Sequence, residues 1–229
     1  MKTVLQFKSK WISVLLAAMS LPALAFAGTN DDLQRRAQNA AYVFTDIMNN
    51  AEQTIPLSLL KKATCIATIP DVVRVGFIVG VRSGDGVVSC RVPGGWSEPS
   101  FLSLRSASYG AQIGLAASDL VLVFTTSRAI ENLSKDGFTI GAGLSAAAGP
   151  VGRDAQAGID YELRNEIYSY SKSRGLFAGA TVEGSSLQVD RQSNSVVYGG
   201  ASAQQILSKE SRSSSLGWSY PKTLLGFTK

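Results

Sequence analysis

The apolar residues near the start of the chain follow a helical period. Between residues 32 and 50 they recur every three or four positions, which predicts an amphipathic helix with Phe44 on its apolar stripe. Asp31 and Asp32 lie at its start, where carboxylates cap and complement a helix N-terminus. Pro56 ends this helix and, in a first-turn position, predicts a short second helix through Lys62.

The apolar stripe of the first helix has two possible partners, the rest of the protein or a bilayer. Its polar face carries Arg35 and Arg36 but also Asp46, which makes a weakly basic face. A helix that lies in a membrane surface usually has a strongly basic polar face. We therefore predict that this helix packs on a protein core.

Beyond residue 63 the period changes to two, which is typical of strands. The turn Ser83-Gly84-Asp85-Gly86 carries the glycines that a tight hairpin needs, and further helices are predicted at residues 126–133 and 201–207. The frequent Gly and Ala residues favour closely packed backbone layers. These features predict a single α+β domain with a Gly-rich, mostly antiparallel β-sheet or barrel-like core, N-terminal amphipathic helices and a C-terminal helix. The predicted strands are 64–69, 73–82, 87–92, 101–104, 109–116, 120–125, 138–147, 155–163, 166–171 and 176–182.

The positive charge of the chain is concentrated at its beginning. Of the formal net charge of +5 among 229 residues, three charges come from Lys2, Lys8 and Lys10. An apolar run at 11–18 and the small-x-small triplet ending at Ala27 complete the pattern of a secretory signal peptide. Cleavage after Ala27 would leave a charge of 5 − 3 = +2, which argues against a nucleic-acid partner.

This pattern predicts a periplasmic or secreted protein, with an uncleaved signal anchor as the alternative. No Cys follows the apolar run, so a lipid-anchored lipoprotein is not predicted. We assign residues 1–27 to the signal peptide, 28–207 to the folded domain and 208–229 to a loosely ordered C-terminal tail.

The two cysteines, Cys65 and Cys90, lie in the part predicted to be exported. An oxidising compartment and an even count favour a disulfide between them. The alternative is a pair of buried thiols that behave as small apolar side chains.

The composition excludes several kinds of chemistry. The chain has no His, which removes Ser-His-Asp and Cys-His catalytic arrangements and His-ligated metal sites. Two Cys cannot alone hold a structural zinc, and no phosphate-binding loop is present, so neither a metal nor a cofactor is predicted. Paired carboxylates for glycoside chemistry remain an alternative, although solvated surface positions are favoured for these residues: Asp119, Asp154, Asp160, Glu162 and Glu166.

Two turns combine cations with hydroxyl groups. One contains Arg153, and the other runs through Ser171, Lys172, Ser173 and Arg174. If the segments from 138 to 182 form an up-and-down meander, both turns lie at the same end of the sheet. We predict that these five residues form an anionic-lipid site, the alternative being ordinary surface cations. The next candidates are Lys61, Lys62 and Arg74.

Several motifs occur in an order that resembles the SYLF-domain family. They cover most of the chain between residues 51 and 207. The motifs are Cys65-Ile-Ala-Thr-Ile-Pro70, Gly80 with Gly84-Asp-Gly86, Ser89-Cys90-Arg91, Gly95-Trp-Ser-Glu-Pro-Ser-Phe101, Gly110-Ala-Gln-Ile-Gly114, Gly149-Pro-Val-Gly-Arg153 and Ile167-Tyr-Ser-Tyr-Ser-Lys-Ser-Arg-Gly-Leu-Phe-Ala-Gly179.

The resemblance implies a non-enzymatic lipid-binding domain. Eukaryotic relatives associate with phosphoinositide membranes, some fungal ones bind actin, and bacterial relatives are exported proteins. Export would keep this chain away from cytoplasmic actin, so the predicted partner is an anionic lipid or membrane surface. A structural or protein-interaction module of the cell envelope is the alternative, and an uncharacterised envelope enzyme is the third. The sequence leaves the oligomeric state open.

Overall fold

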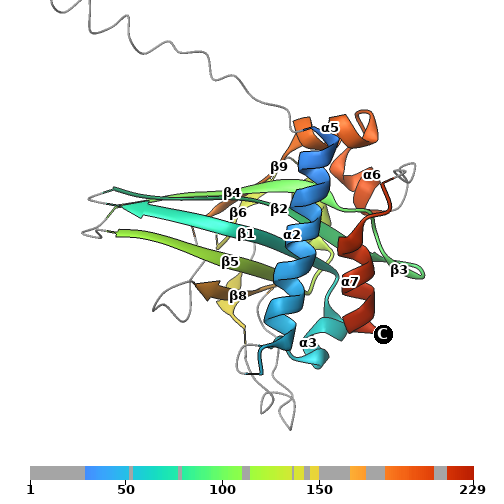
Figure 1. The fold of residues 1–229 in the computed structure, drawn as a ribbon, viewed down its shortest axis with the longest axis horizontal. Helices are drawn as coiled ribbons and strands as arrows, with labels where there is room; N and C mark the ends of the chain where they lie inside the picture. Colours follow the sequence, from blue (N-terminus) through green and yellow to red (C-terminus); the bar gives the residue numbers. More distant parts are fainter. Residues whose placement is uncertain are drawn as a thin grey trace, which may run out of the picture.

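The computed structural model describes residues 29–51, 54–76, 79–109, 114–135, 137–141, 145–149, 166–173, 184–208 and 216–229. Within them, one β-sheet curls into a half-barrel, and helices α2 (Asn30–Asn49) and α7 (Ser219–Thr228) lie side by side across one of its faces (Figure 1). The remaining described helices are shorter: α3 (Leu57–Lys62), α4 (Arg128–Ser134), α5 (Arg191–Tyr198) and α6 (Ala203–Leu207). The predicted α+β class and single domain are confirmed.

Helix α2 forms where the apolar period predicts it. Thr29 caps its N-terminus by accepting a hydrogen bond from the backbone N–H of Asp32, whose carboxylate accepts one from the Thr29 N–H. The apolar stripe is buried in the protein, and Phe44 at its centre has no exposed surface. The Phe44 ring meets Phe227 of α7 edge to face at 5.7 Å between centroids. The prediction that this stripe packs on a core is confirmed.

The sheet contains nine strands within the described residues. Their order is β6-β9-β4-β2-β1-β5-β8-β7, with β3 paired to β2 outside this path. Only the β7–β8 pair is parallel among the described pairs. The strands are β1 (Cys65–Gly76), β2 (Val79–Val92), β3 (Gly95–Trp96), β4 (Ser100–Tyr109), β5 (Gly114–Phe124), β6 (Gly137–Thr139), β7 (Ala146–Ala148), β8 (Ile167–Ser173) and β9 (Ser186–Val189).

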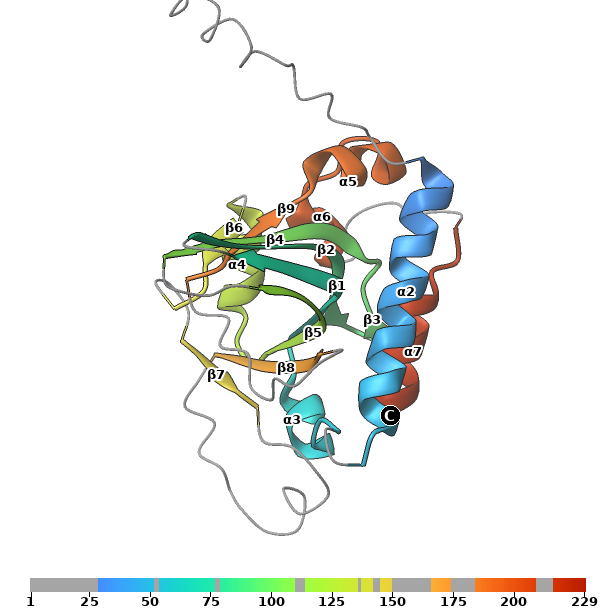
Figure 2. The same ribbon diagram turned by 60° about the vertical axis from the view of Figure 1, so that its left-hand side comes forward.

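Alternate residues of each strand enter two apolar layers. Ile66, Val87 and Val121 face α2 and α7, whereas Ala67, Val88 and Leu122 face the inside of the half-barrel. The inner layer is closed by α4 and α6 on the side opposite α2 (Figure 2). A sheet buried on both faces explains why these strands are almost continuously apolar.

The predicted turn at Ser83–Gly86 is wrong, because these residues lie inside the long strand β2. Gly84 and Gly86 have a different role in the structure. A Cβ at Gly86 would lie 2.3 Å from the carbonyl oxygen of Thr68, and one at Gly84 would lie 2.8 Å from Val72 Cγ2. The register of β1 against β2 shifts between Thr68 and Val73, so β1 bulges toward β2 at this point. The glycines therefore allow close backbone approach rather than a reversal of the chain.

Three predicted strands are also wrong. The segment 73–82 is divided between the end of β1 and the start of β2, which pair with each other. The segment 138–147 is divided between β6 and β7, which lie at opposite ends of the sheet order. The segment 109–116 is divided between the end of β4 and the start of β5, which flank the β1–β2 pair. Because β7 pairs directly with β8 in parallel, the segments after 138 do not form the predicted meander. Predicted strands 155–163 and 176–182 lie outside the described residues.

The expectation of loose order after residue 208 is wrong for residues 216–229. Trp218, Tyr220 and Leu224 are buried in the core beneath α2. The Tyr220 hydroxyl lies 2.9 Å from the Thr68 hydroxyl and donates to the Ile66 carbonyl at 3.2 Å. Helix α7 therefore completes the layer that covers the sheet.

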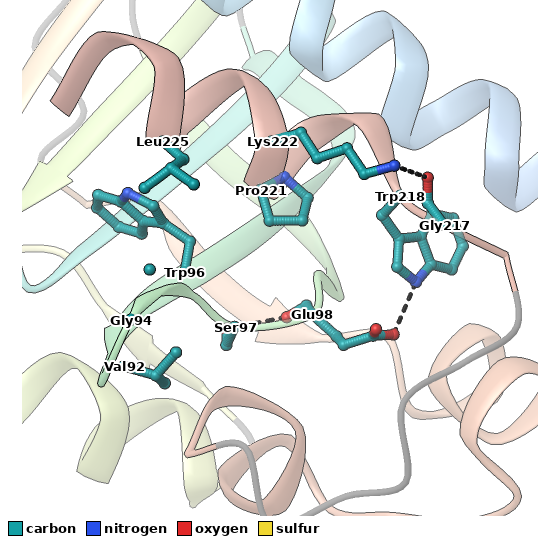
Figure 3. Close-up of a pocket in the computed structure, with 11 residues that line it drawn as sticks. Val92, Gly94, Trp96, Ser97, Glu98, Gly217, Trp218, Pro221, Lys222 and Leu225 are labelled. Carbon is teal, nitrogen blue, oxygen red and sulfur yellow. Dashed lines mark hydrogen bonds between the residues drawn. The ribbon is translucent and has the colours of Figure 1, made fainter. Parts of the chain in front are cut away.

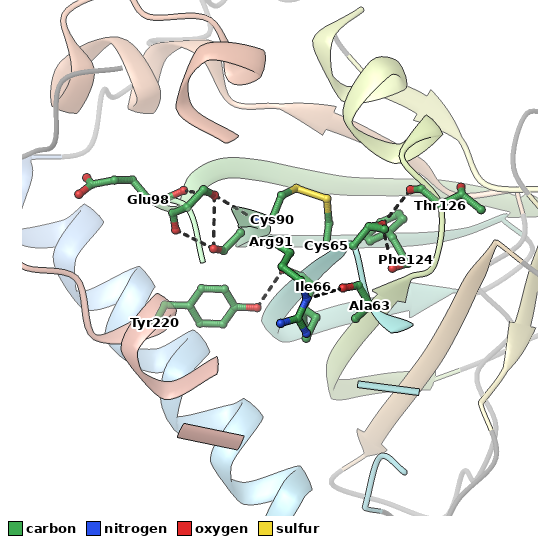
Figure 4. The surroundings of a disulfide bond; sticks show 12 residues. Ala63, Cys65, Ile66, Cys90, Arg91, Glu98, Phe124, Thr126 and Tyr220 are labelled. Atoms are coloured by element: carbon green, nitrogen blue, oxygen red, sulfur yellow. Dashed lines mark hydrogen bonds between the residues drawn. A yellow bond between two sulfur atoms is a disulfide. The ribbon is translucent and has the colours of Figure 1, made fainter. Parts of the chain in front are cut away.

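The disulfide predicted between Cys65 and Cys90 is present (Figure 4). The two residues lie directly opposite each other on β1 and β2, with Cα atoms 3.9 Å apart, and neither is exposed. The bond joins the ends of the two strands that form the centre of the sheet.

We predict that the Cys65→Ala/Cys90→Ala variant is about 3 kcal/mol less stable than the parent, because the bond restricts the unfolded chain over a separation of 25 residues. Denaturant melts of the oxidised parent, the reduced parent and the variant measure the effect. Mass spectrometry of unreduced, alkylated protein checks the bond itself. Two alkylated thiols in the unreduced protein, or a reduced parent with an unchanged midpoint, would contradict this prediction.

Candidate functional site

The four central strands extend beyond the helices that cover the sheet. In Figure 1, the ends of β4, β2, β1 and β5 project to the left, away from α2 and α7. We call this projecting end the sheet tip and define it as residues 73–76, 79–82, 105–109 and 114–117. Its two faces differ in chemistry because successive side chains of a strand point to opposite faces.

The face of the tip that continues the helix-covered side carries exposed apolar side chains on β1, β2 and β5. Val75 of β1 lies opposite Val81 of β2 and also opposite Leu115 of β5, so the three side chains form one row. Their exposed fractions are 54%, 52% and 76%. Val73, two residues before Val75 on the same face, is 40% exposed. We call these four residues the apolar row.

The opposite face of the tip, on the inside of the half-barrel, carries two adjacent arginines. Arg74 of β1 is paired with Arg82 of β2 in the strand register, and both are half-buried. The pKa of Arg82 is lowered from its usual value, first because burial disfavours the charged form and then because Arg74 adds a second positive charge. The tip therefore combines two adjacent cations with an exposed apolar row.

Sequence reasoning found only part of this tip. Arg74 was a secondary candidate, whereas Arg82 and the apolar row were missed because the chain was expected to turn at Ser83–Gly86. The alternation of Val and Arg on both sides of Gly76 and Gly80 was the available signal, since it places valines on one face and arginines on the other.

The predicted lipid-binding residues are only partly within the described chain. Arg153 and Arg174 lie outside the described residues. Lys172, on β8, forms an ion pair with Asp46 of α2 and so ties the sheet to the helix. The Ser171 hydroxyl is buried without a hydrogen-bond partner among the described residues, and Ser173 lies opposite Ser118 in the strand register. The lipid site at these five residues stays a prediction.

A groove of about 300 Å³ lies between the β3 hairpin and the start of α7 (Figure 3). Trp96 and Trp218 line it. The indole N–H of Trp96 donates to the Thr228 hydroxyl at 2.9 Å, and that of Trp218 donates to the Glu98 carboxylate at 2.9 Å. The Lys222 ammonium on its rim donates to the Gly217 carbonyl at 3.4 Å. The two indole contacts fasten α7 to β3 and to the residues that follow it.

A second cluster of charges surrounds Arg36 near the N-terminal end of α2. Its guanidinium donates to the Asp190 carboxylate at 3.0 Å and lies over the Phe101 ring at 5.6 Å from the centroid. Nearby, Arg105 is paired with Asp85 at 2.9 Å. Because each of these two arginines is paired with a carboxylate, the charges in this cluster largely offset one another.

The described part of the chain offers no group of three His, Cys, Asp or Glu side chains that could hold a metal ion. No described helix is both long and apolar enough to span a membrane.

Comparison with known proteins identifies relatives over most of the chain. A family model described as "Ysc84: Las17-binding protein actin regulator" matches residues 105–220. The SH3 domain-containing YSC84-like protein 1 of Xenopus laevis is 37% identical over 72% of this chain and 50% of its own length. The human protein of the same name is 36% identical over 73% of this chain and 51% of its own length.

A yeast relative gives the same result. The LAS seventeen-binding protein 3 of Saccharomyces cerevisiae is 36% identical over 74% of this chain and 38% of its own length. The chain thus spans about half or less of the length of these curated relatives. The family is described by binding and regulation rather than by catalysis. The order of the motifs, the matched family model and the relatives agree, and the chain therefore belongs to the Ysc84 family of SYLF domains.

Proposed function

We propose that this protein is a non-enzymatic domain that binds anionic lipid surfaces through the sheet tip. The observation that carries the proposal is the cross-strand pair of Arg74 and Arg82 at an exposed end of the sheet. Like charges directly opposite each other on neighbouring strands are destabilising. A phosphate placed between the two guanidiniums would relieve this repulsion and accept charge-assisted hydrogen bonds from both.

The predicted turn cluster of Arg153, Lys172 and Arg174 is kept as a second contact in this proposal. Its only described cation, Lys172, already pairs with Asp46. The tip is the primary lipid contact in this proposal, because both of its arginines lie side by side at an exposed end of the sheet. The turn cluster adds to it.

The proposal includes export of the protein, since residues 1–27 have the pattern of a signal peptide. An exported domain meets the outer side of a membrane, where phosphate headgroups and not cytoplasmic filaments are available. We accordingly propose a membrane lipid as partner in place of actin.

We predict that the Arg74→Gln/Arg82→Gln variant binds anionic vesicles about thirtyfold more weakly at low salt, because each cation near a negative surface contributes about 1 kcal/mol. Vesicle co-sedimentation at a series of lipid concentrations measures this. The matched control is Lys61→Gln/Lys62→Gln, which removes two exposed cations from α3 and leaves the tip intact. The control is expected to bind nearly as well as the parent.

Equal losses in the two variants would mean that net charge and not the tip attracts the lipid. A folded tip variant that binds like the parent would shift the site to Arg153, Lys172 and Arg174.

A second candidate function is the binding of a protein segment. The yeast relative is named a LAS seventeen-binding protein, and a protein segment would bind this chain in the groove that Trp96 and Trp218 line. A folded parent that ignores anionic vesicles would favour this function over lipid binding.

A further inference from the structure

We infer that the apolar row of the sheet tip enters the acyl region of the bilayer, while Arg74 and Arg82 bind lipid phosphate groups at the membrane interface. This inference rests on the proposed function and adds to it a mode of contact. It turns the tip from a surface that adsorbs electrostatically into a wedge that penetrates the membrane interface.

The distribution of exposed apolar side chains points to the tip. Of seven large apolar side chains that are exposed in the described part of the chain, four belong to the apolar row: Val73, Val75, Val81 and Leu115. The other three, Tyr42, Leu57 and Val196, lie on three different helices. Scattered apolar residues are normal on a protein surface, whereas a contiguous group marks a surface that contacts a partner or a membrane.

The spacing of charge and apolar surface suits a lipid interface. Arg74 lies between Val73 and Val75 along β1, and Arg82 follows Val81 along β2, so each arginine is next to an apolar side chain that points the other way. An arginine has a long apolar stem that can extend along apolar surface and keep its guanidinium in the polar layer. When the tip enters edge-on, the valines can reach the acyl chains while both guanidiniums stay at phosphate depth.

The arginines also distinguish a membrane from a second copy of this chain. A symmetric contact through the apolar row would bury that row alone, because Arg74 and Arg82 lie on the opposite face of the tip and would gain no negative charge from the second copy. An anionic bilayer instead supplies negative charge beside an apolar phase. A bilayer can therefore contact the apolar row and the two arginines at the same time, and we assign it as the partner of the apolar row.

The experiment uses a variant that removes the apolar row but keeps its strands and its charge: Val75→Thr/Val81→Thr/Leu115→Thr. Threonine has the β-branched shape that strands favour. The matched control is Tyr42→Gln/Leu57→Thr/Val196→Thr, which removes the same number of exposed apolar side chains elsewhere. Parent, variant and control are first compared by melting temperature and by oligomeric state, and only folded proteins are then tested.

Two readouts separate penetration from adsorption. One is the rise in surface pressure when protein is added beneath an anionic phospholipid monolayer, and the other is vesicle binding at low and high salt. We expect the parent to raise the pressure and to retain part of its binding at high salt, where electrostatic attraction is screened. The tip variant should lose the pressure rise and bind roughly sixtyfold more weakly, because it removes three apolar groups from the acyl region and each contributes about fourfold to membrane attachment. The control should behave like the parent.

A tip variant that penetrates and binds like the parent overturns this inference and leaves the proposed function in place. A parent that dimerises in solution, with a monomeric tip variant, also overturns it and assigns the row to a second copy. A parent that does not bind anionic vesicles at all overturns the proposed function itself.

Discussion

Replacing Phe44 with Asp is expected to unfold the domain. Phe44 has no exposed surface and lies where α2, α7 and the sheet meet, with Phe227 at 5.7 Å. Removing a buried Phe side chain costs about 3–5 kcal/mol. The carboxylate adds the cost of placing a charge in an apolar core. The sum reaches the whole stability of a typical domain.

The matched control for this prediction is Tyr42→Asp, two residues away on the same helix. Tyr42 is 73% exposed, so its replacement should change the unfolding free energy only slightly. Circular dichroism melts of the two variants measure the difference. If Phe44→Asp kept the parental melting temperature and lost only lipid binding, the apolar stripe of α2 would bind the membrane and would not pack in the core.

The second large effect is expected at Gly86. A Cβ there would lie 2.3 Å from the Thr68 carbonyl oxygen and 2.8 Å from the Ile69 Cα, and both neighbours belong to the backbone. Neither can move without disturbing the pairing of β1 with β2. We predict that Gly86→Ala lowers the unfolding free energy by about 3 kcal/mol, at the upper end of what overpacking costs.

Gly226→Ala is the control for Gly86. Gly226 lies in α7 with open space where the alanine methyl group would be, and Ala favours a helix over Gly by up to about 1 kcal/mol. Denaturant melts should therefore shift in opposite directions for the two variants. A Gly86→Ala protein as stable as the parent would mean that the backbones of β1 and β2 are not in close contact at the bulge.

The sequence allowed the parts of the fold with a clear period to be predicted. Helix α2 was predicted because its buried residues repeat every three or four positions, and the disulfide because Cys65 and Cys90 were an even pair in a segment expected to be exported. The helical period is a local feature of the sequence, and the number of cysteines can be counted directly.

The order of the strands in the sheet could not be predicted from such local features. Gly84 and Gly86 have the spacing of a turn, but their role comes from the bulge of β1 on the neighbouring strand. The division of 138–147 into β6 and β7 is a consequence of contacts at two distant edges of the sheet. Long-range pairing of this kind leaves little local signal.

The candidate site was missed for the same reason. Arg74 and Arg82 become neighbours only when β2 continues through Ser83–Gly86, because a turn at that point would separate them. The apolar row likewise needs β5 beside β1, which brings Leu115 next to Val75. Its residues could be recognised individually as apolar, but their common exposure depends on where α2 and α7 stop covering the sheet (Figure 1).

The most direct measurement of the central claim is the binding of the parent protein to vesicles that differ only in charge. Vesicles of neutral phospholipid and vesicles with an added anionic phospholipid are titrated with the protein at low and at high salt, and bound protein is measured by co-sedimentation. The account predicts strong binding to the anionic vesicles, little to the neutral ones, and a marked loss at high salt. Equal binding to both kinds of vesicle, or binding to neither, would contradict it.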